Sequence, residues 1–101
     1  VVGIKNVKLE WVKLKAPDGY ILELLQYFSH SQKKSITKQK PNQLGCSHIA
    51  FGVNNINIVC DLIEKMGGSI VNPPALTVKK NVKVSYCHDN EGNLIEIVEV
   101  L

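Results

Sequence analysis

Three side chains in this sequence have the types and surroundings to do chemistry together. Glu23 and Glu96 each stand among aliphatic residues, in the segments YILELLQYF and NLIEIVEV, and His48 stands in CSHIAFGV. Carboxylate oxygens and an imidazole nitrogen form a ligand set that first-row divalent ions accept. A carboxylate on an apolar face is strongly destabilising unless a cation, a protein partner or water compensates it. The three side chains therefore predict a divalent-metal site.

Each of these side chains also has an ordinary structural explanation. A histidine near the start of a strand can be a structural residue with satisfied hydrogen bonds, and a glutamate can face solvent when a sheet has one wet side. Glu23 has a leucine on either side of it, so the alternation alone does not decide which face of its strand is buried. Ala50 and Gly52, which share a face with His48, are small and leave room for a ligand or for another side chain.

The remaining polar and aromatic candidates are interpreted as surface, turn or core residues. His30 begins a polar stretch and His88 precedes a turn, so both are predicted at the surface. The aromatic side chains could line a pocket, but packing in the core is their more common role. The turn residues of this group are Asp18, Asp89 and Glu91, and the aromatic ones are Trp11, Tyr20, Tyr27 and Tyr86.

The N-terminal part of the sequence predicts an antiparallel hairpin. Apolar residues alternate over residues 7–14, and residues 20–28 read as the returning strand. The turn between them, Ala16-Pro17-Asp18-Gly19, joins a proline with a preset φ angle to a glycine that accepts a positive one. Residues 1–28 would thus form the end of a first module, and the largely polar residues 29–44 predict a connector.

Residues 45–101 predict a complete β-α-β-β-β module. The helix is expected after Asn54-Asn55, which are good N-cap residues, and before Gly67-Gly68, which ends a helix in the usual way. Between these two signals, aliphatic residues recur at helical spacing. Strands are expected at residues 46–53, 69–72, 81–88 and 93–100, with a loop from Pro73 to Lys80.

The two strand pairs end in the same sequence pattern. Asp18 to Leu25 and Glu91 to Val98 both read as an acid, a glycine, two residues, an aliphatic residue, a glutamate and two aliphatic residues. An internal repeat of this kind indicates two modules of one supersecondary type. The alternative is a coincidence between two hairpins, because short hairpin patterns are common.

Length, charge and hydropathy narrow the class of protein. A chain of 101 residues fits one compact domain, and much of its formal net charge of +3 comes from a lysine-rich stretch in the expected connector. That pattern argues against a nucleic-acid-binding face. No apolar run approaches the ~20 residues that a membrane-spanning helix needs, and no signal peptide is expected. Cys46, Cys60 and Cys87 are odd in number and lack a C-x-x-C spacing, so they are expected to be reduced thiols of a cytoplasmic protein.

The order of these segments resembles the vicinal oxygen chelate superfamily, which includes glyoxalases, bleomycin resistance proteins and extradiol dioxygenases. Residues 47–56, followed by a helix and Gly67-Gly68, are similar to the opening of one module of that family. Residues 89–96, DNEGNLIE, resemble its D-P-x-G-N-x-I-E ending with Asn90 in place of proline, and residues 16–23 resemble the same ending of the preceding module. The resemblance covers essentially the whole chain. It implies an α+β fold in which paired βαβββ modules form a half-open barrel around a metal, with an incomplete N-terminal module.

The resemblance also implies a ligand set. His48 and Glu96 would be metal ligands of the second module, Glu23 would be the glutamate ligand of the first, and the ion would be divalent Zn, Ni, Mn or Fe. His48 and Glu96 are 48 residues apart, and the same spacing before Glu23 leads to position −25, outside the chain. The fourth ligand, His or Gln in this family, would then come from residues before Val1 or from a second chain, unless the site is degenerate. Dimers are common in the family, which implies a homodimer.

The chemistry implied is proton transfer. In glyoxalase-like and epimerase-like members, a glutamate at the metal moves a proton beside a carbonyl group, and Glu96, followed by Glu23, is the candidate for that base. The leading expectation is thus a glyoxalase I-like lyase or isomerase with a small-molecule substrate. The alternatives are a drug-binding protein of the bleomycin resistance type, which needs no catalytic metal, and an extradiol-dioxygenase-like enzyme. A mildly basic chain with few aromatic residues fits a groove for a cationic drug poorly.

Overall fold

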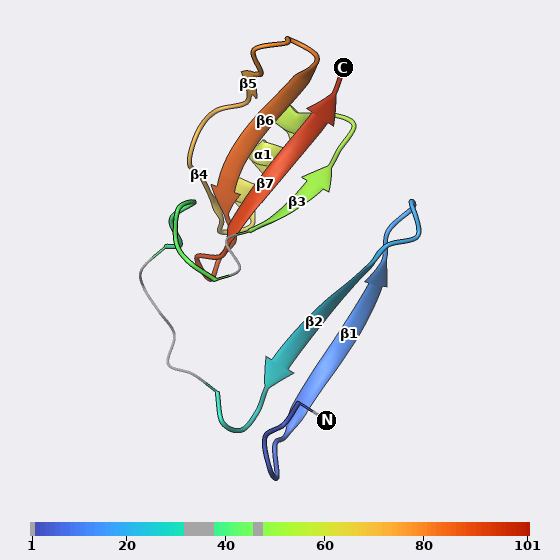
Figure 1. Cartoon of the computed structure of the whole chain (residues 1–101), viewed down its shortest axis with the longest axis vertical. Helices are drawn as coiled ribbons and strands as arrows, with labels where there is room; N and C mark the ends of the chain where they lie inside the picture. Colours follow the sequence, from blue (N-terminus) through green and yellow to red (C-terminus); the bar gives the residue numbers. More distant parts are fainter. Residues whose placement is uncertain (1, 32–37, 46–47) are drawn as a thin grey trace. The chain divides into compact units, whose positions relative to one another are not determined.

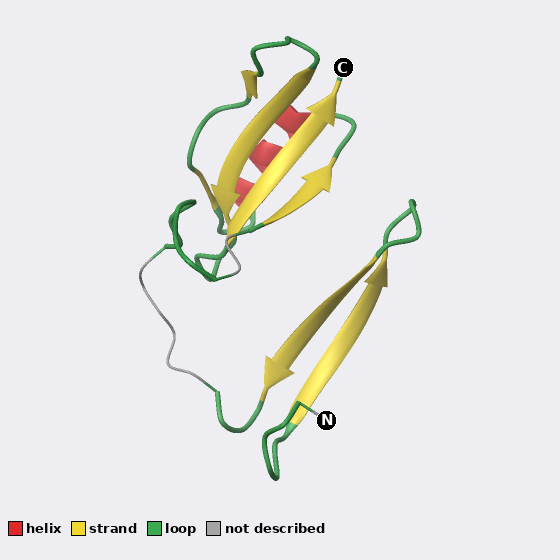
Figure 2. Cartoon of the chain, in the orientation of Figure 1, coloured by secondary structure: helices red, strands yellow, loops and turns green. Residues whose placement is uncertain are grey.

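The protein is described by a computed structural model, which covers residues 2–31, 38–45 and 48–101. The chain divides into two compact units, Val1–Lys33 and Lys34–Leu101. The described residues form two sheets and one α-helix, so the expected mixed α+β fold class is confirmed (Figure 2). In this part of the chain, no helix has the length and apolar character needed to cross a membrane.

The first unit is a two-stranded antiparallel hairpin. Strand β1 (Leu9–Lys15) pairs with β2 (Ile21–Tyr27) in the register that places Lys13 opposite Glu23. The turn is closed by a 2.9 Å backbone hydrogen bond from the N–H of Gly19, which adopts a φ of +94° that a side chain would disfavour. The expected hairpin is therefore confirmed, with small differences at the strand ends.

Many apolar side chains of this hairpin are exposed. Trp11 and Tyr20 are 47% and 79% exposed, so the expectation that they pack in a core is wrong. The physical reason is that a two-stranded hairpin has no second layer of its own to cover either face. Val12, Leu14 and Leu24 share one face of the ladder and are also exposed, so the hairpin carries an apolar surface.

The second unit is a βαβββ module built on one sheet. Its elements are β3 (Ile49–Gly52), α1 (Ile56–Lys65), β4 (Ser69–Ile70), β5 (Ala75–Leu76), β6 (Val82–His88) and β7 (Leu94–Val100). The strand order is β3-β7-β6-β4, and β5 also pairs with β6. The β3–β7 pair is parallel and the other pairs are antiparallel. Helix α1 covers one face of this sheet (Figure 1).

Strand β5 corrects one expectation about this unit. The sequence predicts a loop from Pro73 to Lys80, but Ala75–Leu76 pair with β6. Because β4 and β5 pair with successive parts of β6, together they form one interrupted strand at the edge of the sheet. The interruption falls at Pro73-Pro74, where the backbone lacks the N–H groups that a ladder needs.

The helix begins and ends where the sequence predicts. The side chain of Asn55 accepts a hydrogen bond from the backbone N–H of Ile58 at 3.1 Å, which caps the first turn. Gly67 follows the last turn with a φ of +96°, the conformation that ends many helices. The core lies between α1 and the sheet, and its buried residues are Ile56, Cys60, Cys87 and Ile97.

The two cysteines of this core are free thiols, as the sequence predicts. Cys46, the third cysteine, lies outside the described residues. Burial raises the pKa of the Cys87 thiol, and the proximity of Cys60 and Asp89 raises it further. The folded protein therefore favours the neutral form of Cys87.

The repeat in the sequence is also a repeat of backbone structure. Adding 73 to the residue numbers that bound β1 and β2 gives the numbers that bound β6 and β7. The registers correspond as well, because Lys13 faces Glu23 as Tyr86 faces Glu96. Each of the two connecting turns contains a glycine with a positive φ at the equivalent place. The two glutamates therefore occupy equivalent positions in two matching strand pairs.

Candidate functional site

His48 and Glu96 lie side by side on the second unit. The Nε2 atom of His48 is 3.1 Å from the Oε2 atom of Glu96. The two side chains meet because Ala50, two residues after His48 on the same face, is the register partner of Glu96 on the adjacent strand. Both side chains are 22% exposed, so the pair is partly shielded from water and still open to a small ligand.

The pair lies on the face of the sheet that α1 leaves uncovered. Ile97 and Cys87 belong to the core between helix and sheet. Side chains alternate along a strand, so Glu96 and Tyr86, one position before each of them, point to the opposite face. Tyr86 is the register partner of Glu96. Its ring also meets the ring of His48 in an edge contact, with centroids 5.1 Å apart and planes at 73°.

Tyr86 shares the electrostatic environment of Glu96. Burial is the largest cause that raises the pKa of the Tyr86 hydroxyl, and the charge of the Glu96 carboxylate and a side-chain hydrogen bond with it raise that pKa further. The hydroxyl therefore stays protonated and can donate to the carboxylate. The sequence interpretation, which treats Tyr86 as an ordinary core aromatic residue, misses this role. Counting outward from the turn between the two strands would have placed Tyr86 opposite Glu96.

Glu23, the third predicted ligand, belongs to the other unit. It is exposed on β2, with Lys13 directly opposite on β1. The pair that the structure brings together therefore consists of His48 and Glu96. Within residues 2–31, 38–45 and 48–101, no three His, Cys, Asp or Glu side chains gather into a group that could hold a metal ion. A ligand set of three residues stays a prediction.

The chemistry of the His48–Glu96 pair fits a divalent ion. Imidazole nitrogen and carboxylate oxygen bind such ions at about 2.0–2.2 Å, so two ligand atoms at right angles around one ion are about 3 Å apart. The 3.1 Å between Nε2 and Oε2 is compatible with two adjacent ligand positions. The same distance suits the hydrogen bond that the structure shows. The pair could therefore supply two ligands, and the others would come from elsewhere.

His88 is not the surface residue that the sequence predicts. It is 7% exposed, and its Nε2 atom is 2.7 Å from the backbone oxygen of Gln39. The side chain of Gln39 accepts a 2.8 Å hydrogen bond from the backbone N–H of Leu94, and its own backbone N–H donates to the Gly92 carbonyl. A piece of the expected connector thus packs against the end of β6, which no local pattern in the sequence indicates. His30, by contrast, is exposed as predicted.

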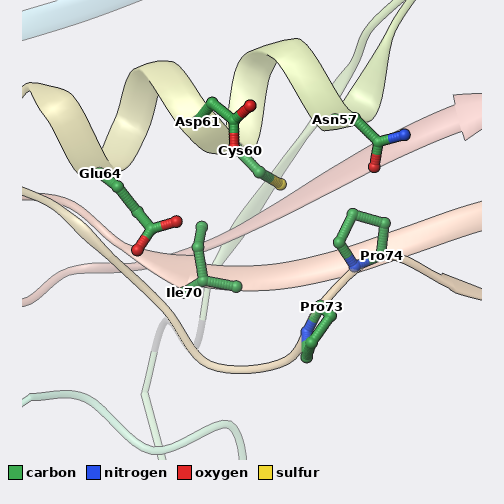
Figure 3. Close-up of a pocket in the computed structure, with 7 residues that line it drawn as sticks. All are labelled: Asn57, Cys60, Asp61, Glu64, Ile70, Pro73 and Pro74. Carbon is green, nitrogen blue, oxygen red and sulfur yellow. The ribbon is translucent and has the colours of Figure 1, made fainter.

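A pocket of about 330 Å³ lies beside α1, between the helix and the segment that contains Pro73 and Pro74 (Figure 3). Asp61 and Glu64 give its helix side two carboxylates. The predicted ligands and Tyr86 are not among its lining residues, so this pocket is separate from the His48–Glu96 pair. No motif in the sequence singles out its lining residues, which are Asn57, Cys60, Asp61, Glu64, Ile70, Pro73 and Pro74.

Comparison with known proteins gives one consistent result. The family model of the Glyoxalase/Bleomycin resistance protein/Dioxygenase superfamily matches residues 3–97. Proteins named "Probable lactoylglutathione lyase" from Synechocystis sp. and Vibrio cholerae are 33% and 31% identical over 55 and 61 residues. These matches cover 54% and 60% of this chain but 42% and 43% of the relatives, so the matched region spans less than half of either relative. A solved glyoxalase family protein from Bacillus cereus has a similar fold, with a TM-score of 0.81 and 23% identity over 94% of this chain and 64% of that one.

Proposed function

Because the chain belongs to the glyoxalase, bleomycin resistance protein and dioxygenase superfamily, we propose that it acts as a metal-dependent, glyoxalase I-like lyase or isomerase. The proposed reaction is proton transfer at a carbon atom next to a carbonyl group of a small substrate. The observation that carries the proposal is the His48–Glu96 pair, an imidazole and a carboxylate 3.1 Å apart on the uncovered face of the sheet. The names of the relatives from Synechocystis sp. and Vibrio cholerae favour this branch of the superfamily.

The proposed metal ligands in this chain are Glu23, His48 and Glu96, and the proposed ion is divalent Zn, Ni, Mn or Fe. When bound, the ion would supply positive charge that stabilises negative charge on substrate oxygens. His48 would bind through Nε2, the atom that faces Glu96. Glu23 is included because it occupies the position equivalent to that of Glu96 in the matching strand pair.

Glu96 is the proposed general base, with Glu23 as the second candidate. Its register neighbour on β3 is Ala50, and a side chain this small would leave space for a substrate beside the carboxylate. A substrate in that space would have a carbon-bound proton within reach of a Glu96 oxygen. The proton would pass from the substrate carbon to the carboxylate and return to a neighbouring carbon. His48 and Tyr86 would hold the carboxylate in place during both transfers.

A cytoplasmic homodimer completes the proposal. The exposed aliphatic residues of the hairpin, among them Val12 and Leu14, form the kind of surface that favours burial against a partner. The free thiols Cys60 and Cys87 suit a reducing compartment. Sedimentation velocity of the purified protein at micromolar concentration should show a dimer, and a monomer at every concentration would contradict this part of the proposal.

Titration calorimetry on the metal-stripped protein tests the function. Ni²⁺, Zn²⁺, Mn²⁺ and Fe²⁺ are titrated in turn without air, and tight binding of one ion per site is expected. The loaded protein is then assayed with hemithioacetals, acyl-thioesters and catechols, and isomerisation of a hemithioacetal is the expected reaction. Cleavage of a catechol would indicate the dioxygenase-like alternative. A folded protein that binds no ion but binds a cationic drug would replace the proposal with the drug-binding alternative.

A further inference from the structure

We propose that Tyr86 is a positioning residue of the His48–Glu96 site, which holds both side chains in the geometry that binds the ion. This inference rests on the proposed function of the same site. Two geometric observations define the role. The ring of Tyr86 meets the imidazole of His48 in an edge contact, and Tyr86 stands opposite Glu96 in the ladder, where its hydroxyl can donate to the carboxylate. The role requires no gain or loss of a proton by Tyr86.

The backbone places Tyr86 against both members of the pair. It stands directly opposite Glu96 in the β6–β7 ladder, where Cβ atoms of facing residues are about 4.5–5.5 Å apart. Its ring centroid is 5.1 Å from that of His48 with the planes at 73°, inside the range of about 4.5–7 Å that edge-to-face aromatic pairs prefer. Because β6 is a central strand of the sheet, its ladder fixes the backbone from which Tyr86 reaches the pair.

The shape of a carboxylate explains why a second donor matters. Its two oxygens offer about four lone-pair sites, and the contact with His48 involves Oε2. The terminal torsion of a glutamate is soft, so one contact leaves the group free to turn. A hydroxyl donor limits that rotation and still leaves lone pairs for an ion. Side chains that orient a ligand in this way typically change metal affinity by about ten- to a hundredfold when they are removed.

The first unit shows that the repeated hairpin does not itself require a tyrosine at this place. Lys13 occupies the equivalent register position, opposite Glu23. A lysine has no aromatic ring that could pack against an imidazole. Tyr86 is therefore a feature of the His48–Glu96 site and not of the strand pair as such.

Three variants distinguish the effect of the Tyr86 hydroxyl from the effect of its ring and from a general effect of losing a tyrosine hydroxyl. Tyr86→Phe removes the hydroxyl and keeps the ring, and Tyr86→Leu removes both. Tyr20→Phe is the matched control, since it removes the hydroxyl of a tyrosine that is 79% exposed. Calorimetry with the ion that the wild-type protein binds should show affinity lowered about tenfold or more by Tyr86→Phe, further by Tyr86→Leu, and unchanged by Tyr20→Phe. Wild-type metal affinity in Tyr86→Phe would overturn the proposal. This holds even if Tyr86→Leu bound the ion weakly, because the ring without its hydroxyl would then be enough to position the pair.

A second measurement uses the metal-free protein and does not depend on the proposed function. With ¹³C in glutamate carboxyl groups and ¹⁵N in histidine rings, Tyr86→Phe should shift the Glu96 carboxyl signal and the His48 ring signals. The signal of Glu91, an exposed turn residue, should not move. Unchanged signals from Glu96 and His48 would refute the positioning role. A wild-type protein that binds no ion refutes the proposed function instead, so the two failures are distinguishable.

Discussion

Replacing Glu96 with glutamine should weaken metal binding strongly and leave the fold intact. Glutamine has nearly the same shape without the charge, and it can still form a hydrogen bond with Nε2 of His48, 3.1 Å away in the wild-type protein. Both side chains are 22% exposed, so the contact resembles a partly solvated ion pair, worth about 0.2–1 kcal/mol. For a domain of this size, the upper end of that range corresponds to a fall in Tm of about 4–8 °C.

The effect on metal affinity should be much larger than the effect on stability. Glu96→Gln removes an anionic ligand, and residues that only orient a ligand already contribute up to about a hundredfold in metal affinity. A hundredfold change in Kd is about 2.8 kcal/mol, because each tenfold step is about 1.4 kcal/mol. The variant should therefore lose at least a hundredfold in affinity while it unfolds in nearly the same range of urea as the wild-type protein.

The assay compares Glu96→Gln with Glu91→Gln, which removes the same charge from an exposed turn residue. Calorimetry gives the affinity of each metal-stripped protein, and urea unfolding gives its stability. Wild-type affinity in Glu96→Gln would remove this residue from the site. A loss of stability above about 3 kcal/mol would also refute the reasoning, because it is the magnitude expected from breaking a fully buried ion pair.

Two further perturbations test the surroundings of the site. Gly68→Ala should destabilise the protein by about 1–3 kcal/mol in urea unfolding, because the new Cβ would lie 2.5 Å from the His88 carbonyl oxygen and 2.6 Å from Cγ2 of Ile63; wild-type stability would mean that β6 gives way at little cost. Burial raises the pKa of Cys87, so the contribution of Cys87 to the free energy of unfolding should be level below about pH 8.5, the pKa of an unfolded cysteine, and should fall as the pH rises above it. Cys87→Ala should flatten that slope between about pH 8 and pH 10, and an unchanged slope would assign it to other groups.

The elements with strong local signals could be predicted from the sequence. Asn55 and Gly67 sit at the two ends of a segment with helical spacing, and the structure uses them as cap and terminator. The turn after β6 also follows its sequence, since the side chain of Asp89 accepts hydrogen bonds from the backbones of Glu91 and Asn93. His48 and Glu96 could be proposed as neighbours because a family resemblance supplied the pairing that no local rule gives.

What the sequence did not predict depends on contacts between distant segments. His88 is buried because Gln39, 49 residues away, packs against the end of β6. The pairing of Ala75–Leu76 is short and follows two prolines, so it carries no alternation that could be read as a strand. The exposed aromatic residues of the hairpin were mispredicted for a different reason. The alternation in the hairpin is clear, but alternation alone does not say whether another layer covers a face.

The repeat places two glutamates in equivalent positions and gives them different neighbours. Glu96 stands 3.1 Å from His48 and directly opposite Tyr86, whose ring meets that of His48. Glu23 is exposed on β2 and stands opposite Lys13, without an imidazole or a phenol as its register partner. The partly shielded position of Glu96 beside His48 and Tyr86 therefore favours Glu96 over the exposed Glu23 as the base of the proposed reaction.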